Sequence, residues 1–129
     1  MPWDTRAWQD RLELLSSHRA DAWAPAIDVY ETAAAYVVTA EVPGVARDQI
    51  DLALEDARLT LRGQRAARST ASDVLHFHQV ERSHGSFART FEFADKIDVD
   101  RVSADLSEGV LTITLPKVPP PAPRRIAVK

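Results

Sequence analysis

The chain has 129 residues, of which 45% are hydrophobic and 27% charged, and it contains no cysteine. These values are typical of one soluble domain with its own core. The absence of cysteine excludes a disulfide scaffold, a thiol nucleophile and thiolate metal sites. A net charge of −3 argues against nucleic acid as a partner. Because no segment reaches the ~18 apolar residues of a membrane span and no secretory leader pattern is visible, we expect a cytoplasmic protein without a membrane partner.

Residues 1–24 are expected to form an N-terminal arm. Trp3, Trp8, Leu12 and Leu15 recur at intervals of three to five with charged residues between them, which predicts an amphipathic helix over residues 3–15. A helix this short is marginal in isolation, so its apolar stripe needs a surface to pack against. The stripe either docks on its own domain or serves assembly and client binding.

From residue 26 onward the apolar residues alternate with polar ones, the period of a β-strand. Short turns at residues 55–57 and 107–109 are suited to hairpins. Because no long helix separates the strands, we predict an all-β fold, an Ig-like antiparallel β-sandwich spanning residues 25–117. The expected strands are residues 27–30, 36–42, 50–54, 59–62, 75–80, 87–93, 102–106 and 110–115.

Two segments lack strand character. Residues 64–73 are small and polar and predict a mobile loop. Residues 116–123 hold five of the eight prolines, so the C-terminal extension at 118–129 is expected to be a semi-rigid polyproline spacer. The extension ends in Ile126-Ala127-Val128, whose branched side chains share one face of an extended segment, the form in which a peptide adds to a sheet edge.

Charge also separates the tail from the rest of the chain. From residue 116 onward there are four basic residues and no acidic one. Removing these four positive charges from the net charge of −3 leaves −7 for the remainder. The tail therefore carries charge opposite to that of the domain.

Candidate catalytic groups were sought and none forms a convincing site. His76 and His78 would share a strand face and His84 follows, but no acidic residue stands at an obvious spacing to complete a metal site. There is no Gly-x-Ser-x-Gly elbow beside Ser83 or Ser86 and no cluster of glycines for a phosphate loop. We expect no enzyme activity, no cofactor and no metal.

Three motifs nevertheless occur in a specific order. The first is Ala40-Glu41-Val42-Pro43-Gly44-Val45, and the second runs from Glu81-Arg82 through Gly85, Phe87 and Arg89 to Phe91. The third runs from Ala104 through Gly109-Val110-Leu111 to Leu115-Pro116-Lys117, and the terminal Ile126-Ala127-Val128 follows. In this combination, covering residues 23–128, the chain resembles the small heat-shock proteins built on the α-crystallin domain, in their bacterial and plant style. Glu108 stands where the family commonly has Asn, and Ala94 departs from its usual Leu-Pro.

The resemblance implies an ATP-independent chaperone, a holdase that binds partly unfolded client proteins and prevents their aggregation. It further implies a homodimer that assembles into larger homo-oligomers. Two other classes remain open from the residues alone: an Ig-like interaction module of the co-chaperone type without holdase activity, and a metal-dependent β-barrel enzyme using His76 and His78.

The resemblance also implies roles for particular residues. The strand at 75–80 would be lent to the sheet edge at 27–30 of a partner, with Arg89 at the same interface, and the tail anchor Ile126 and Val128 would enter a groove of a neighbouring dimer. The implied dimer interface is Leu75, Phe77, Val80, Arg89, Ile27 and Val29. The implied tail-binding groove is Ile50, Leu52, Leu54, Val102, Ala104 and Leu106.

Overall fold

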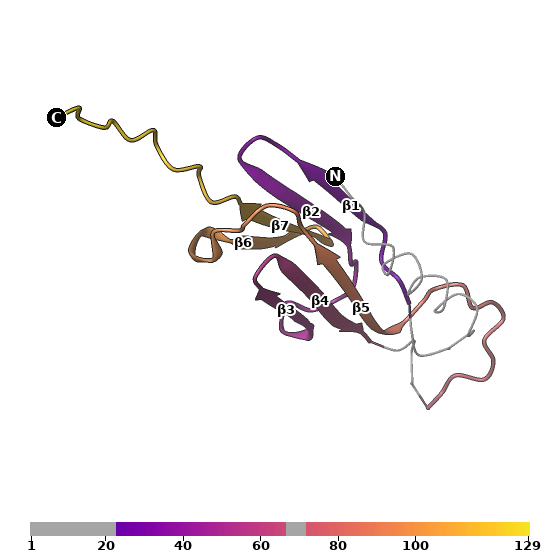
Figure 1. The fold of residues 1–129 in the computed structure, drawn as a ribbon. Coiled ribbons are helices and arrows are strands. Elements are labelled where there is room, and N and C mark those ends of the chain that lie inside the picture. The colour runs from indigo at the N-terminus through magenta and orange to yellow at the C-terminus, as the bar shows by residue number, and fades with distance from the viewer. Residues whose placement is uncertain (1–22, 67–71) are drawn as a thin grey trace.

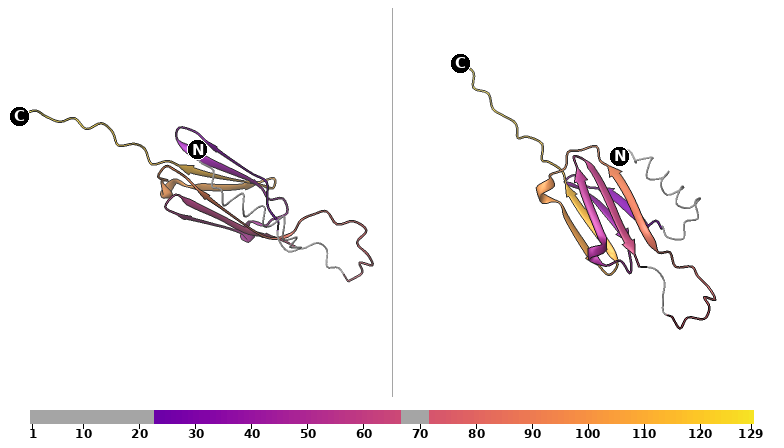
Figure 2. Two further views of the ribbon diagram at one scale, coloured as in Figure 1. Left: turned by 45° about the vertical axis from the view of Figure 1, so that its right-hand side comes forward. Right: turned by 90° about the horizontal axis from the view of Figure 1, so that it is seen from below.

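The computed structural model describes residues 23–66 and 72–129. The predicted helix with Trp3, Trp8, Leu12 and Leu15 lies outside these residues. The described part forms two antiparallel sheets packed face to face (Figures 1 and 2), which confirms the all-β sandwich.

One sheet has four strands in the order β1-β2-β7-β6, and the other has three in the order β3-β4-β5. Every pairing is antiparallel. The elements are β1 (Ile27–Glu31), β2 (Ala35–Glu41), the 3-10 turn η1 (Arg47–Gln49), β3 (Ile50–Glu55), β4 (Arg58–Arg65), β5 (Gly85–Glu92), the 3-10 turn η2 (Val99–Arg101), β6 (Ser103–Ser107) and β7 (Val110–Pro116).

The alternating pattern of the sequence fills the space between the sheets. Leu59 and Leu61 point inward from β4, and their neighbours in the same strand point outward. Strands β2 and β7 contribute inward side chains from the opposite sheet, so the core is closed on both faces. The least exposed of these side chains are Tyr36, Val38, Val42, Leu59, Leu61, Ile113 and Leu115.

Both predicted short turns are present. Glu108 and Gly109 join β6 to β7 with φ angles of 53° and 79°, and a two-residue hairpin turn with both φ angles positive is of type I′. Glycine adopts this conformation without strain, whereas Glu108 is held in it by the flanking strands. Glycine is required at position 63 in β4 for a steric reason, because a Cβ atom there would lie 2.3 Å from Cζ of Phe87.

Two predictions about the segment between β4 and β5 are wrong for this single chain. Residues 75–80 form no strand, because no strand in the part of the chain that the structure describes pairs with them. The loop also begins later than residue 64, since Arg65 still pairs with Gly85 in the ladder between β4 and β5. The backbone pairing of β4 with β5 therefore extends further than the sequence pattern indicated.

The residues before β1 belong to the sandwich. Trp23, which the sequence analysis assigned to the arm, is 7% exposed and packs in the core. Its ring meets Phe87 edge-on with the centroids 5.0 Å apart, and its backbone N donates to the carbonyl of Ser86 at 3.2 Å. Residues 23–26 thus cross from the edge of β5 to the start of β1.

Candidate assembly surfaces

The edges of β3 and β6 face each other along one side of the sandwich, which we call the open flank. A pocket of about 250 Å³ lies between them, lined by Arg47, Ile50, Leu52, Ala104, Asp105, Leu106 and Leu111. Ile50, Leu52 and Leu106 are only partly buried in the described chain, while Leu111 is 3% exposed and forms the floor. The pocket offers apolar side chains with one acidic and one basic residue in its lining.

This pocket brings together four of the six residues predicted for the groove, namely Ile50, Leu52, Ala104 and Leu106. Leu54 and Val102 do not line it, although both are partly buried against the core, as Ile50, Leu52 and Leu106 are. Sequence reasoning missed Arg47, Asp105 and Leu111. The register pairs Leu111 with Leu106, so the hairpin turn at residues 107–109 was the signal for that residue.

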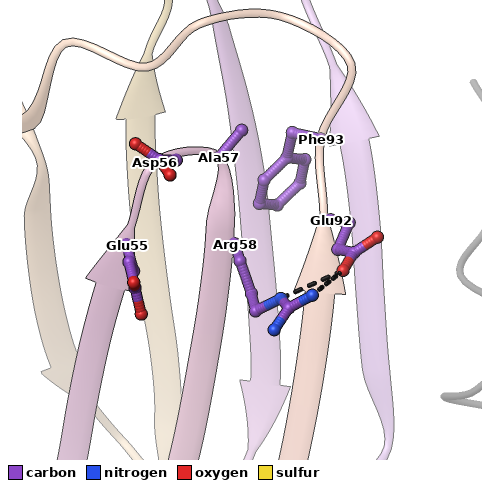
Figure 3. Close-up of a pocket in the computed structure, with 6 residues that line it drawn as sticks. All are labelled: Glu55, Asp56, Ala57, Arg58, Glu92 and Phe93. Atoms are coloured by element: carbon purple, nitrogen blue, oxygen red, sulfur yellow. Dashed lines mark hydrogen bonds and ion pairs between the residues drawn. The ribbon is translucent and has the colours of Figure 1, made fainter.

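A larger hollow of about 370 Å³ lies at the turn between β3 and β4 (Figure 3). Its lining includes the carboxylates of Glu55, Asp56 and Glu92. Arg58 donates to Oε1 of Glu92 from Nε at 3.0 Å and from Nη2 at 2.5 Å. Because this lining is mostly charged, the hollow suits an apolar peptide less well than the smaller pocket on the open flank.

The described part of the loop between β4 and β5 extends away from the sandwich (Figures 1 and 2). It exposes Val74 by 39%, Leu75 by 88%, Phe77 by 52% and Val80 by 49%. Water disfavours several apolar side chains exposed together, so such a patch is typical of a contact surface.

The other predicted dimer residues lie around β1 and β5. β1 is an edge strand of its sheet, and Ile27 and Val29 on it are partly buried against the core. Arg89 is 9% exposed, on the inward face of β5. Its Nη1 lies 3.5 Å from the carbonyl oxygen of Pro25. The single chain therefore covers Arg89 with its own segment before β1.

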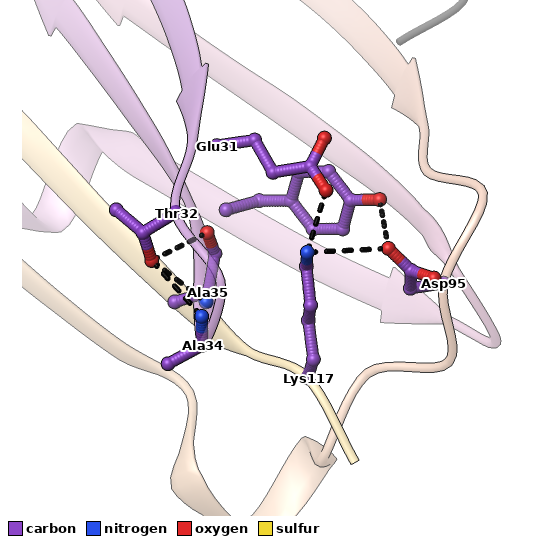
Figure 4. A network of polar contacts seen from close by, with 7 residues as sticks. Glu31, Thr32, Ala34, Ala35, Asp95 and Lys117 are labelled. Carbon is purple, nitrogen blue, oxygen red and sulfur yellow. Dashed lines mark hydrogen bonds and ion pairs between the residues drawn. The ribbon is translucent and has the colours of Figure 1, made fainter. Parts of the chain in front are cut away.

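A network at the end of β7, which we call the tail clasp, fixes the point where the C-terminal extension leaves (Figure 4). Nζ of Lys117 lies 2.5 Å from Oε2 of Glu31 and 3.4 Å from Oδ2 of Asp95, and the Tyr36 hydroxyl donates to the same Asp95 oxygen at 2.6 Å. The backbone N of Val118 donates to the carbonyl of Lys96 at 2.9 Å. Backbone hydrogen bonds to the domain therefore continue through residue 118.

Protonation equilibria follow from these contacts. The hydrogen bond from Tyr36 holds the pKa of Asp95 below its ordinary value, and Lys117 acts in the same direction. The hydrogen bond to Glu31 raises the pKa of Lys117. Burial, together with the hydrogen bond to Asp95, raises the pKa of Tyr36. The clasp is thus most favourable with a charged carboxylate, a charged amine and a neutral phenol.

Beyond the clasp the tail runs outward from the sandwich (Figure 1). No strand is assigned after residue 116, and Ile126 and Val128 are 85% and 97% exposed. The structure therefore does not bring the predicted anchor into the groove of its own chain.

Comparison with known proteins decides the family. The model of the Hsp20/alpha crystallin family matches residues 28–129. The chain belongs to this family. Its members are small heat shock proteins, which are non-enzymatic chaperones that form oligomers and bind client proteins.

Individual members of the Hsp20/alpha crystallin family resemble the chain over most of its length. Spore protein SP21 of Stigmatella aurantiaca is 38% identical over 99% of this chain and 75% of its own. A 17.7 kDa class II heat shock protein of Arabidopsis thaliana is 36% identical over 83% of this chain and 69% of its own. A small heat-shock protein from Xylella fastidiosa, described as having a distinct high-order structure, gives a TM-score of 0.72 at 36% identity, covering 83% of this chain and 97% of that one.

The histidines considered for metal binding are close together in this member of the Hsp20/alpha crystallin family. The rings of His76 and His78 have centroids 6.2 Å apart. Within residues 23–66 and 72–129, however, no group of three or more His, Cys, Asp or Glu side chains is placed to hold a metal ion. The same residues contain no helix of the length and apolarity that crossing a membrane requires.

Proposed function

We propose that this protein is an ATP-independent holdase of the cytoplasm that binds partly unfolded proteins and keeps them from aggregating. The observation that carries the proposal is that apolar side chains lie outside the core at three places: the open flank, residues 74–80 and the end of the tail. A partly unfolded client also exposes apolar segments. Burial of the two apolar surfaces against each other drives binding without a nucleotide. Family membership supports the same activity.

A client aggregation assay tests this proposal. A heat-sensitive client is warmed with increasing amounts of the chain, without ATP, and light scattering is followed. We expect suppression at ratios up to equimolar. Equal scattering with and without the chain at all ratios would show an interaction module rather than a holdase.

We further propose that residues 75–80 add as a strand to β1 of a second copy. An edge strand presents unpaired backbone groups for a further strand. The segment has exposed apolar side chains and belongs to neither sheet of the described residues. Pairing would cover Leu75, Phe77 and Val80 together with the partly buried Ile27 and Val29. Arg89 lies beneath the segment before β1 and would support the same interface.

The substitution Phe77→Lys tests the lent strand, because it places a charge where burial is expected. Native mass measurement at micromolar concentration should show monomers. Ser72→Lys adds the same charge to the same segment outside the proposed strand and should leave the dimer intact. Dimers that persist in Phe77→Lys would contradict the interface.

We propose that Ile126 and Val128 occupy the open flank of a neighbouring dimer. Burying the two side chains yields roughly 3 to 5 kcal/mol, offset by about 1 kcal/mol or more for each tail residue that becomes ordered. A single contact is therefore weak and reversible. Many such contacts in a closed assembly hold it together through their effective concentration, while each can open to admit a client.

The reach of the tail supports docking between molecules. Backbone hydrogen bonds tie the chain to the domain through Val118, so the spacer before the anchor consists of residues 119–125. In polyproline conformation it spans about 22 Å at ~3.1 Å per residue. Arg124, Arg125 and Lys129 flank the anchor and would stay at the rim, near Asp105 in the pocket lining.

A further inference from the structure

The loop that carries residues 74–80 leaves and re-enters the sandwich at one point. Arg65, the last residue of β4, pairs with Gly85, the first residue of β5. A loop joined to its sheet at such a point can pivot about it, and side-chain contacts with its limbs restrict that motion. The contacts around Arg65 therefore bear on the direction of the loop.

The guanidinium of Arg65 binds the returning limb directly. Its Nε donates to the carbonyl of Ser83 at 2.9 Å, and its Nη2 donates to the same oxygen. Its Nη1 donates to the carbonyl of Pro43, in the turn after β2, at 3.2 Å. A rigid planar fork can satisfy both carbonyls at once, whereas the point charge of lysine cannot reproduce that geometry.

Trp23 covers the face of the same guanidinium. The carbon of the guanidinium lies 3.9 Å from the centroid of the Trp23 ring, within the range of a cation–π contact. The indole Nε1 donates to the carbonyl of Gly85 at 2.9 Å, so Trp23 is itself fixed at the base of the loop. Burial, with repulsion from Arg82, lowers the pKa of Arg65, and partial desolvation strengthens the polar contacts of a charged group.

We propose that Arg65 is the positioning residue that sets the direction of residues 72–84, and that it ties this direction to Trp23, where the N-terminal arm joins the domain. The effect of Arg65 on dimer stability rests on the proposal that residues 75–80 pair with β1 of a second copy. A limb already held in place has less conformational freedom to lose when it binds a partner. Loosening it therefore weakens the dimer without removing any contact of the interface.

Spin-label distance measurement tests the anchor itself. The chain contains no cysteine, so labels placed through Gln79→Cys and Arg62→Cys report the distance from the loop to β4. Labelled chains are diluted with unlabelled ones, so that distances within one chain are read. We expect one narrow distribution in the parent and at least a doubling of its width in both Arg65→Lys and Arg65→Gln. An unchanged distribution in these variants overturns the proposal.

Arg58→Lys is the matched control, because Arg58 lies at the other end of β4 and also makes a two-pronged contact, to Glu92. It should leave the distribution unchanged. Exchange of the Trp23 indole proton should become at least ten-fold faster in Arg65→Lys and stay constant in Arg58→Lys. Unchanged exchange of the core amide of Ile113 shows that the sandwich remains folded.

Native mass measurement separates this inference from the lent-strand proposal. With both correct, the dissociation constant of the dimer rises about ten-fold in Arg65→Lys. A parent chain that is monomeric contradicts the lent strand, while the distance and exchange measurements still decide whether Arg65 holds the loop. A wide distribution together with unaltered indole exchange would refute the link to Trp23.

Discussion

The two flanks of the sandwich differ in what fills them. On the flank between β5 and β1, residues 23–26 of the same chain cross over, and Trp23 is 7% exposed. On the open flank between β3 and β6 a pocket of about 250 Å³ remains between Leu52 and Leu106. Near the end of the tail, Ile126 and Val128 are 85% and 97% exposed.

This difference indicates a division of labour between the flanks. On the covered flank, residues 23–26 belong to the same chain and become ordered when the domain folds. Their contacts therefore contribute to the stability of the domain. The open flank leaves apolar side chains partly exposed. The apolar residues proposed to cover them, Ile126 and Val128, follow a spacer that leaves the domain. The contacts proposed there would depend on concentration and could open and close.

Breaking the open flank should have the largest effect. In the variant with Ile126→Ser and Val128→Ser the transfer energy that drives docking is lost, and any assembly larger than a dimer should collapse to dimers. Light scattering and native mass measure the change. The reciprocal substitution Leu106→Ser on the groove should act in the same direction.

Arg124→Ser with Arg125→Ser is a matched pair of substitutions in the same tail that spares the anchor. These residues are expected at the rim, so the assembly should persist and should lose less of its stability than the parent when salt is added. A particle of parental size from the Ile126 and Val128 variant would show that the tail does not join dimers.

Breaking the covered flank should act on folding instead. Trp23→Ala removes a buried ring that contacts Phe87, and we expect a loss of about 3 kcal/mol in the free energy of unfolding. Urea denaturation measures it. Tyr30→Ala, which truncates an aromatic side chain that is 53% exposed on β1, should cost far less. Equal losses of unfolding free energy in the two variants would argue against a stabilising role for Trp23 on the covered flank.

The sequence pattern predicted the sandwich well because strand alternation and turn chemistry are local signals. The hairpin between β6 and β7 was visible in residues 107–109, and its register places Leu106 beside Leu111. Four groove residues followed from the family resemblance. Arg47 was missed because it enters the pocket from a 3-10 turn, where no period of two marks which side chains face inward.

Residues 75–80 show why alternation alone is insufficient. The segment has the composition of a strand, yet a strand needs a neighbour, and none of the strands in residues 23–66 and 72–129 pairs with it. Trp23 was missed for a related reason. Its place in the core depends on contacts with Gly85 and Ser86, more than 60 residues away in the chain, and no local pattern reports such a contact.

A smaller effect is expected at the hairpin that forms one wall of the groove. Glu108 adopts a φ of 53°. For residues other than Gly, Asn or Asp, this conformation costs roughly 1 kcal/mol of conformational free energy. Glu108→Asn should therefore stabilise the domain by about 0.5 to 1 kcal/mol in urea denaturation. Glu55→Gln removes an exposed acidic charge from an ordinary strand conformation. If it stabilises the domain equally, charge rather than backbone strain is responsible.

The smallest effect concerns the tail clasp, whose charged groups Glu31, Asp95 and Lys117 are partly exposed and therefore screened by solvent. Because the pKa of Asp95 is lowered in the folded chain by the Tyr36 hydrogen bond, its contribution is present above the ordinary carboxyl pKa and is lost as pH falls through the folded value. Tyr36→Phe removes the donor. The stability difference between the parent and Tyr36→Phe should thus shrink on acidification from pH 7 to below the Asp95 pKa. A difference that stays constant would mean that the phenol acts through packing alone. Thermal unfolding of both chains across this range measures it, with Asp95→Asn as the variant in which the acid-dependent part should be absent.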